Sequence, residues 1–336
     1  GYAPSGGALQ RFLESKKIPL LMMDKAGLLA KKDGGTYEVF RDRVIFPIRN
    51  HYNKLIAFGG RAIGEVQPKY LNSPETALFK KGECFYGENF AYTNCYKNNR
   101  AIVVEGYFDQ LKMQAAGFSE TVATLGTAVT ERHLERLWSM ADEILMCLDG
   151  DEAGKRASKK VIELALPKVK ANKFISFVIL PKGNDPDDII TSKGADYMEK
   201  CINNRITLSQ MIWVAETQDK IFLSAEEFAT LEAKLAAYLQ PINDVLIIKS
   251  YKRFFSDQIW QMRKRKAAKV ANNVAPSFAA INNNLLELAI IAMLIKFPDL
   301  FDDLNISTKL QNVEFSQQYN AYINKEKVAF LETDIL

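Results

Sequence analysis

The chain has 336 residues, of which 48% are hydrophobic and 25% are charged, and its formal net charge is +4. This length and composition are ample for hydrophobic cores in more than one domain. The four cysteines (Cys84, Cys95, Cys147, Cys201) form no CxxC pair, which argues against a zinc ribbon or a disulfide scaffold and favours the reducing cytoplasm. The longest apolar stretch, Leu285–Ile295, is too short to span a bilayer.

Charge is distributed unevenly along the chain. Residues Gly1–Arg100 carry 16 Lys and Arg against 9 Asp and Glu, a net charge of +7, so the remainder carries −3. A basic first third suits a polyanionic partner, although solvated surface lysines explain the same excess equally well. The chain opens with GYAPSGG, without an initiating Met or a signal segment, so we expect a fragment or a processed protein.

The first two sections of the chain differ in pattern. Residues 1–100 are irregular, and the segments Val44–Ile48 and Leu55–Phe58 predict antiparallel strands in a basic mixed α+β subdomain. Residues 101–200 alternate between short apolar runs and helical patterns, which predicts a parallel α/β sheet with right-handed crossovers. The predicted strands are Ala101–Val104, Thr121–Thr124, Ile144–Leu148 and Phe174–Leu180, and the helices lie near Tyr107–Ala116, Thr130–Met140, Glu152–Leu164 and Pro186–Lys200.

The remaining sections are predicted to be helical. From Leu208 to Lys269, within a subdomain of residues 201–269, apolar residues at helical spacing predict a bundle of about three helices, one of them broken by Pro241. Residues 270–284 have the small, uncharged composition of a linker. After it, Leu285–Phe297 predicts an apolar helix that begins a further domain, residues 285–336.

Three acidic clusters follow apolar runs of the predicted sheet. They read EGYFD, DGDEAG and NDPDD, and they contribute Glu105, Asp109, Asp149, Asp151, Asp185 and Asp187. Because the carboxyl ends of parallel strands lie along one edge of a sheet, these six carboxylates can converge on one small volume. Such a cluster requires cations, and oxygen ligands without His or Cys favour Mg²⁺ or Mn²⁺. The sequence therefore predicts a metal site suited to phosphoryl or nucleotidyl transfer.

Each cluster also has a simpler interpretation. A D-x-D is common in solvated turns, Asp109 can favour the positive end of a helix, and DPDD can be a helix N-cap with Pro in the first turn. All three clusters at strand ends of one sheet make the shared site the better interpretation. His51 and His133 have no second His or Cys at ligand spacing, so we expect surface or capping roles for them.

The order and spacing of the clusters resemble the Toprim domain, which primases, several topoisomerases and some nucleases share. The preceding segments are more specific. FRDRVIFPI (Phe40–Ile48), AFGGRAIG (Ala57–Gly64), PKYLNSPETALFKKG (Pro68–Gly82) and LGTAVT (Leu125–Thr130) closely resemble bacterial DNA primase of the DnaG type, in that family's order. The resemblance covers roughly residues 1–265, and the zinc module that precedes the core in that family is not in this sequence.

The resemblance implies site residues. Arg61, Lys69, Tyr70, Asn72 and Lys81 stand inside matching motifs and are implied to face template and nucleotides, while Arg41 and Arg43 add cations beside them. Tyr70 can stack on a base and Asn72 can hydrogen-bond one. Asp149, Asp151, Asp185 and Asp187 would bind the metal. Glu105 is either a general base or a shared metal ligand, and Asp109 would orient a cationic neighbour or a metal-bound water.

The function expected from this resemblance is metal-dependent, template-directed synthesis of short RNA primers on single-stranded DNA, in the bacterial cytoplasm at the replication fork. The expected partners are single-stranded DNA, ribonucleoside triphosphates, the RNA–DNA hybrid and, through the C-terminal region, the replicative helicase. For residues 285–336 a simple stabilising role explains the apolar helix equally well. We expect no membrane and no zinc, and a monomeric core. A Toprim topoisomerase would need a tyrosine nucleophile on a separate domain, and a binding module with a relic Toprim would have lost acids, so both alternatives are disfavoured.

Overall fold

The computed structural model describes residues 1–274 except 33–34, 66 and 219. The chain separates into two compact units, Gly1–Asp257 and Gln258–Leu336. All described elements up to helix α10 lie in the first unit, and the described part of the second is the continuation of helix α11.

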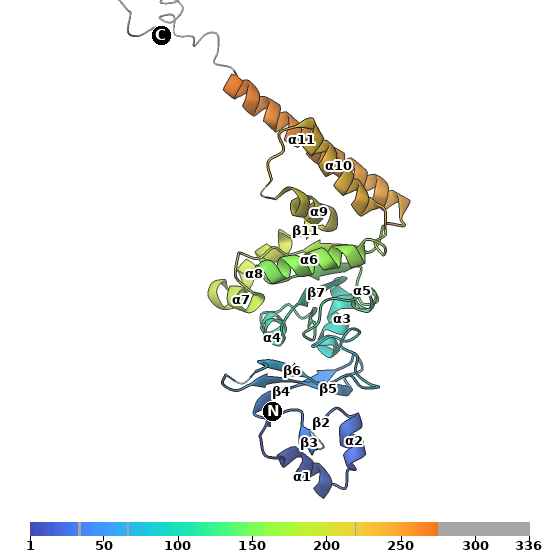
Figure 1. Cartoon of the computed structure of the whole chain (residues 1–336), viewed down its shortest axis with the longest axis vertical. Coiled ribbons are helices and arrows are strands. Elements are labelled where there is room, and N and C mark those ends of the chain that lie inside the picture. Colours follow the sequence, from blue (N-terminus) through green and yellow to red (C-terminus); the bar gives the residue numbers. More distant parts are fainter. Residues whose placement is uncertain (33–34, 66, 219, 275–336) are drawn as a thin grey trace, which may run out of the picture. The chain divides into compact units, whose positions relative to one another are not determined.

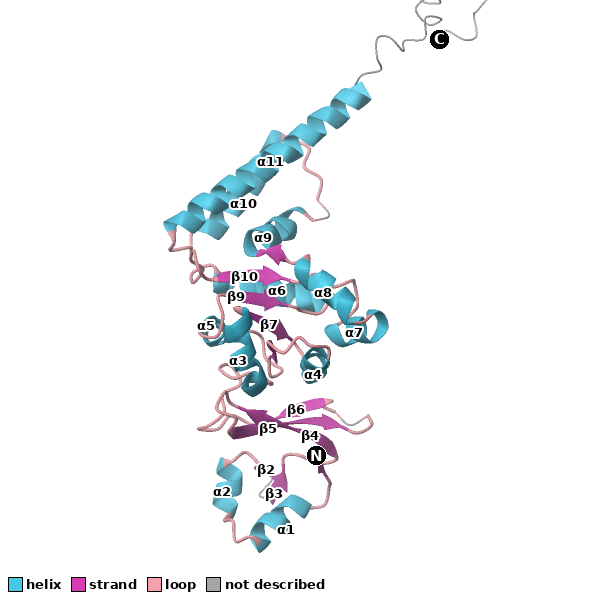
Figure 2. Ribbon diagram, turned by 180° about the vertical axis from the view of Figure 1, so that it is seen from behind, coloured by secondary structure: helices cyan, strands magenta, loops and turns pink. Residues whose placement is uncertain are grey.

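The N-terminal part is built on an antiparallel sheet of four strands in the order β1-β4-β5-β6: Tyr2–Ala3, Arg43–Arg49, Leu55–Ala62 and Tyr70–Asn72. Strands β4 and β5 pair with Val44 opposite Arg61 and Ile48 opposite Ala57, which confirms the two strands predicted here. A small lobe precedes β4, consisting of α1 (Ala8–Ser15), α2 (Leu20–Lys25) and the hairpin of β2 (Leu29–Lys32) and β3 (Gly35–Glu38). Figures 1 and 2 show the sheet as a layer between this lobe and helices α3 and α4.

The second sheet has five strands in the order β11-β10-β9-β7-β8: Ile206–Thr207, Phe174–Phe177, Glu143–Met146, Arg100–Val104 and Thr121–Ala123. The four strands β10, β9, β7 and β8 are parallel, as predicted. Ala101–Val104 are fully buried, which explains why this strand is a continuous apolar run rather than an alternating one. Helices α3 to α8 accompany the sheet: Glu88–Asn98, Tyr107–Ala115, Glu131–Trp138, Glu152–Ala165, Pro186–Lys193 and Ala195–Asn203.

One helix and one strand of this part of the chain differ from the prediction. The helix expected over Pro186–Lys200 is two helices, α7 and α8, because Gly194 between them has a φ of 82° and a ψ of 172°, a conformation that ends α7. A short strand, β11, pairs antiparallel with β10 at the edge, so the sheet is mixed. Only two residues long, β11 is below the length at which a strand pattern can be recognised in sequence.

Three helices follow the sheet, as predicted: α9 (Leu208–Thr217), α10 (Ala225–Leu239) and α11 (Val245–Val274). Pro241 lies in the turn between α10 and α11. Helix α11 continues to Val274, so residues 270–274 of the predicted linker are helical. Residues 275–284 and the predicted domain 285–336 lie outside the described residues.

Candidate active site at the strand ends

The acidic residues lie at the carboxyl edge of the central strands. Glu105 follows β7, Asp149 follows β9, and Asp185 ends the loop after β10. Because β7 pairs with β9 and β9 with β10, these three positions are neighbours along the edge. The backbone N–H of Asp149 donates to Glu105 Oε1 at 3.3 Å, so the first two segments are in direct contact.

Glycine brings the second and third segments together. The Gly150 N–H donates to the carbonyl of Asn184 at 3.1 Å, and the Gly183 N–H donates to the carbonyl of Gly150 at 3.0 Å. A Cβ at position 150 would lie 2.4 Å from the carbonyl oxygen of Pro181, so any other residue would push the two loops apart. The glycine of the DGD motif thus lets Asp149 lie beside the loop that carries Asp185.

Burial, and after it the repulsion between neighbouring carboxylates, raises the pKa of three of these acids. Burial, followed by the charges of Glu105, Asp109, Asp185 and Asp151, raises the pKa of Asp149 to about 7. Burial and Asp185 raise the pKa of Asp109 to about 6. Burial also raises the pKa of Glu105, and the charge of Asp151 adds to it. The acids therefore share one electrostatic site, and a cation in it would relieve their repulsion.

Several of these acids also cap helices, as the simpler interpretation predicted. Asp151 accepts from the N–H of Gly154 at 2.8 Å at the start of α6, and Asp185 accepts from the N–H of Asp188 at 2.7 Å at the start of α7. Asp109 accepts from the N–H of Gly106 at 3.0 Å in the first turn of α4. Each of these bonds engages one carboxylate oxygen and fixes the direction of the side chain, so capping and a role in the site are compatible.

The donor set fits a hard divalent cation in its chemistry. It is all oxygen, and Asp149 Oδ1 is buried without a hydrogen-bond partner in the described part of the chain, which is costly unless a further ligand occupies it. Among the described residues, no three His, Cys, Asp or Glu side chains are already gathered at metal-ligand spacing. Asp187 is partly engaged: its Oδ1 lies 3.4 Å from Lys112 Nζ and accepts from the Thr191 hydroxyl at 3.1 Å.

Arg61 and Tyr70 form an ordered cationic and aromatic group next to the acids. The Arg61 guanidinium lies 4.3 Å from the ring centre of Phe108 and 5.7 Å from that of Tyr70. Burial raises the pKa of Tyr70, Arg61 lowers it, and Asp109, Asp185 and Asp187 raise it further. The ring centre of Tyr70 lies 6.1 Å from that of Tyr107, which stands between Glu105 and Asp109 in the chain, so the N-terminal sheet meets the acidic edge at this residue.

The amide of Asn72 is hydrogen-bonded to two segments of the second sheet. Its Oδ1 accepts from the Tyr107 hydroxyl, and its Nδ2 donates to the carbonyl of Leu125 at 2.6 Å. Each end of the amide makes one bond to a segment of the second sheet, which uses one of its two N–H groups, so hydrogen bonding of a base by Asn72 stays a prediction. The side chain joins strand β6 to α4 and to the loop before α5.

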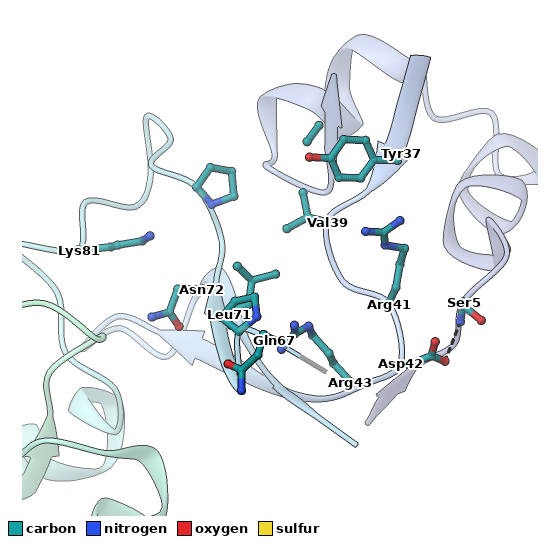
Figure 3. A pocket seen from close by; sticks show the side chains of 13 residues that line it. Ser5, Tyr37, Val39, Arg41, Asp42, Arg43, Gln67, Leu71, Asn72 and Lys81 are labelled. Carbon is teal, nitrogen blue, oxygen red and sulfur yellow. Dashed lines mark hydrogen bonds between the residues drawn. The ribbon is translucent and has the colours of Figure 1, made fainter. Parts of the chain in front are cut away.

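A pocket of about 650 Å³ opens beside this junction, and we call it the basic pocket. Figure 3 shows Lys81 and Asn72 on one side of it and Arg41 and Arg43 on the other. Tyr37 lines the same space, with the Arg41 guanidinium 5.1 Å from its ring centre. Arg43 is buried, and its guanidinium donates to the carbonyl of Lys69 at 3.4 Å.

The cations of this region have few anionic partners. No salt bridge among the described residues involves Arg41, Arg43, Arg61, Lys69 or Lys81. Together with Tyr70 these five residues form what we call the basic surface. Sequence reasoning missed two aromatic contributors, Tyr37 and Phe108. Phe108 stands inside the EGYFD motif between two acids, and its position there was the available signal.

Across the described residues, no helix combines the length and apolarity needed to cross a membrane.

Comparison with known proteins matches two family models to neighbouring parts of this chain. Residues 1–92 match the family model of the DNA primase catalytic core, N-terminal domain, and residues 99–177 match that of the Toprim domain. A Toprim domain in a primase core implies the use of divalent metal ions in general.

The relatives with similar sequences are DNA primases. The chain is 46% identical to the DNA primase of Rickettsia conorii over 337 residues, covering 97% of this chain and 57% of that protein. It is 40% identical to the DNA primase of Pseudomonas aeruginosa over 247 residues, covering 72% of this chain and 36% of the relative. The chain therefore spans little more than half the length of its Rickettsia relative.

Solved structures match the fold. A DNA primase domain from Pseudomonas aeruginosa superposes with a TM-score of 0.70 at 34% identity, covering 78% of this chain and 85% of that one. A DnaG primase catalytic domain bound to single-stranded DNA gives a TM-score of 0.70 at 30% identity, covering 76% and 84%. On its sequence, its fold and the composition of its site, the chain belongs to the DnaG-type DNA primases, as part of their catalytic core.

Proposed function

We propose that this chain is the catalytic core of a primase that synthesises short RNA primers on single-stranded DNA. One observation carries the proposal: Tyr70 and Arg61 of the basic surface lie against the segment that carries Glu105 and Asp109, with the Tyr70 ring centre 6.1 Å from that of Tyr107 and the Arg61 guanidinium 4.3 Å from that of Phe108. A surface that holds phosphates and bases then adjoins a site that holds cations. The solved DnaG domain described as bound to single-stranded DNA supports the choice of template.

In this proposal Asp149, Asp151, Asp185 and Asp187 hold Mg²⁺ or Mn²⁺, and no zinc is used by this part of the protein. The bound metal would acidify the attacking 3′-hydroxyl and neutralise charge on the leaving pyrophosphate. Asp149 is the central ligand, since its Oδ1 is buried and unpaired within the described residues. Asp187 must share its carboxylate with Lys112, 3.4 Å away.

Glu105 and Asp109 flank these ligands. Glu105 is a general base or a shared ligand; its raised pKa suits the first role and its contact with the Asp149 backbone suits the second. Asp109 is 8% exposed and holds the N-terminus of α4, so it positions Phe108 and through it Arg61. The reacting atoms belong to the nucleotides; as a general base Glu105 would accept a proton from them, whereas Asp109 acts through its neighbours.

The basic surface would hold the template and the incoming ribonucleoside triphosphate. Arg61, Lys69 and Lys81 would contact phosphates, and Tyr70, 40% exposed, would stack on a base. Arg41 and Arg43 would extend the phosphate contacts along the basic pocket. Asn72 joins the two sheets, and its second N–H group would contact a base.

The wider biological setting is part of the same proposal. We place the protein in the bacterial cytoplasm at the replication fork, with the RNA–DNA hybrid as product. The division into subdomains 1–100, 101–200 and 201–269, a monomeric core, and contact of residues 285–336 with the replicative helicase are further proposals of the same kind.

The test separates chemistry from binding in the full chain. Asp149→Ala should abolish incorporation of labelled ribonucleotides on single-stranded DNA, both with and without a pre-annealed RNA primer, while changing DNA affinity less than twofold. Lys69→Ala should weaken DNA binding by about 1 kcal/mol and leave the maximal rate nearly unchanged. Normal synthesis by Asp149→Ala would contradict the site, and strand cleavage or relaxation by the wild-type protein would indicate a nuclease or topoisomerase instead.

A further inference from the structure

We propose that Thr130 and His133, at the start of helix α5, are positioning residues that hold Lys81 in the basic pocket. The inference rests on the proposed function, because it concerns how the basic surface is kept in place against the Toprim sheet. Neither residue is expected to touch a nucleotide. They act through the backbone of the loop from Lys80 to Cys84.

The hydroxyl of Thr130 and the ring of His133 reach across to this loop. The Thr130 hydroxyl donates to the carbonyl of Gly82 at 2.5 Å. His133 Nε2 lies 2.9 Å from the carbonyl oxygen of Lys81 and 3.2 Å from that of Cys84. Contacts to three carbonyls of one five-residue loop are more than capping of α5 requires, since capping is already provided by the bond from the His133 N–H to Thr130 Oγ1, at 3.1 Å.

The hydrogen bonds of His133 determine which of its ring nitrogens carries the proton. The Thr130 N–H donates to His133 Nδ1 at 3.3 Å, so Nδ1 is the acceptor and Nε2 carries the hydrogen that is donated to the two carbonyls. The imidazole is fully buried against the ring of Phe85, with ring centres 4.5 Å apart, and burial lowers its pKa. It is therefore neutral at physiological pH, with both nitrogens satisfied in one orientation.

The other side of Lys81 is held as well. Its N–H donates to Glu75 Oε1 at 3.2 Å. With the N–H and the carbonyl of the residue both bound, the Cα–Cβ direction is set, and the side chain extends into the basic pocket, as Figure 3 shows. The next residue back, Lys80, differs: its ammonium lies 3.7 Å from Glu83 at the surface, and it does not line the pocket. We call the contacts of Thr130 and His133 with this loop the clamp. The clamp holds the lysine that lines the pocket, Lys81, and not its neighbour Lys80.

The test compares Thr130→Val with Thr130→Ser in the full chain. Valine keeps the shape but loses the hydroxyl, whereas serine keeps it. Thr130→Val should weaken single-stranded DNA binding by roughly three- to tenfold and reduce its salt dependence, with kcat at saturating substrate unchanged, and Thr130→Ser should restore wild-type binding. Equal affinities for the two variants would overturn the proposal.

Two further variants separate positioning from loss of stability. In a Lys81→Ala background Thr130→Val should have no additional effect on binding, because the clamp acts through Lys81. Ser224→Ala removes the cap of the distant helix α10, where Ser224 Oγ accepts from the Glu227 N–H at 3.1 Å. It should lower the melting temperature like Thr130→Val but leave DNA affinity unchanged. An effect that persists without Lys81, or equal weakening by Ser224→Ala, would contradict the clamp.

The readouts also distinguish this inference from the proposed function. DNA binding is measured by fluorescence anisotropy without nucleotides, so it tests the clamp whether or not primers are made. A wild-type protein that binds DNA but makes no RNA contradicts the proposed function alone. Primer synthesis by wild-type protein together with indistinguishable Thr130 variants contradicts the clamp alone.

Discussion

At the scale of single residues, the acids at the strand ends keep charge where the fold would be more stable without it. Asp149 is held beside Glu105 by the loop contacts of Gly150, with one oxygen buried and unpaired among the described residues. Such an arrangement costs stability and is typical of sites organised for a ligand rather than for folding. This loss of stability can be measured as a difference in unfolding free energy when the Asp149 carboxylate is replaced.

Asp149→Asn should stabilise the metal-free protein at pH 8 by about 1–2 kcal/mol, a value reduced for solvent screening of this half-buried group. The pKa of Asp149 is raised to about 7 in the folded protein, so the stability it contributes is complete below its unfolded pKa and is lost as pH rises towards 7. The advantage of Asn should therefore disappear between pH 8 and pH 4. Urea unfolding of both proteins in the presence of a chelator measures this difference in unfolding free energy. Equal unfolding free energies of the wild type and Asp149→Asn at pH 8 would contradict the crowded site.

Bound metal should offset the stability advantage of Asp149→Asn over the wild type. If the wild-type carboxylates bind Mg²⁺ in the folded state, adding it at pH 8 should raise the unfolding free energy of the wild type and leave that of Asp149→Asn nearly unchanged. Equal stabilisation of both proteins would show that the ion binds elsewhere.

Asn72 and Tyr70 are neighbours in one motif with different expected roles. Asn72→Ala should lower the unfolding free energy by about 1–3 kcal/mol, because the Tyr107 hydroxyl and the Leu125 carbonyl lose their partner. Tyr70→Ala should instead weaken single-stranded DNA binding by about 1–3 kcal/mol with little loss of stability. Urea unfolding and anisotropy on both variants test this, and the reverse pattern would contradict the role of Asn72 in joining the two sheets.

At the scale of elements, periodicity identified the parallel strands and the helices after them, because buried strands of such sheets are short apolar runs. It did not detect the break at Gly194, since Gly within a helical pattern is also tolerated as part of a continuous helix. It also could not detect β11, whose two residues pair with β10 through tertiary contact. The acid positions were predictable because strand ends define them, whereas the partners of Asn72 come from segments up to 53 residues away.

We expect the position of Asp149 to depend on the contact between the DGD loop and the 181–184 loop. Gly150→Ala would place a Cβ 2.4 Å from the Pro181 carbonyl oxygen, so the loops must separate. We expect primer synthesis to fall by about 100-fold or more, since misplacement by about 1 Å has such effects, while DNA binding is retained. A synthesis assay with an anisotropy control measures this, and near-normal activity would show that the loop contact does not organise the acids.

At the scale of the whole molecule, the candidate site lies where two sheets formed by different parts of the sequence meet. The basic N-terminal third was visible as an excess of Lys and Arg, but charge alone did not show that these residues adjoin the acids. The junction is formed by Arg61 on Phe108, Asn72 on Tyr107, and Thr130 and His133 on the loop of Lys81. The motifs of the family implied this proximity, and the contacts give it a physical basis.

The salt dependence of DNA binding should report on the basic surface. Arg61→Ala should reduce the slope of log K against log[salt] by about 1, because one phosphate contact is lost. Lys80→Ala, which removes a surface lysine paired with Glu83, serves as the matched control and should leave the slope unchanged. Equal slopes for Arg61→Ala and the wild type would place the nucleic acid elsewhere.

The most direct test of the central claim is template-directed incorporation by the full chain. On a single-stranded DNA template with an annealed RNA primer and Mg²⁺ or Mn²⁺, the ribonucleotide added first should be the complement of the next template base, and it should change when that base is changed. Chelator and Asp149→Ala should each remove the signal. Incorporation that ignores the template base, or that survives both controls, would contradict the assignment of this site to primer synthesis.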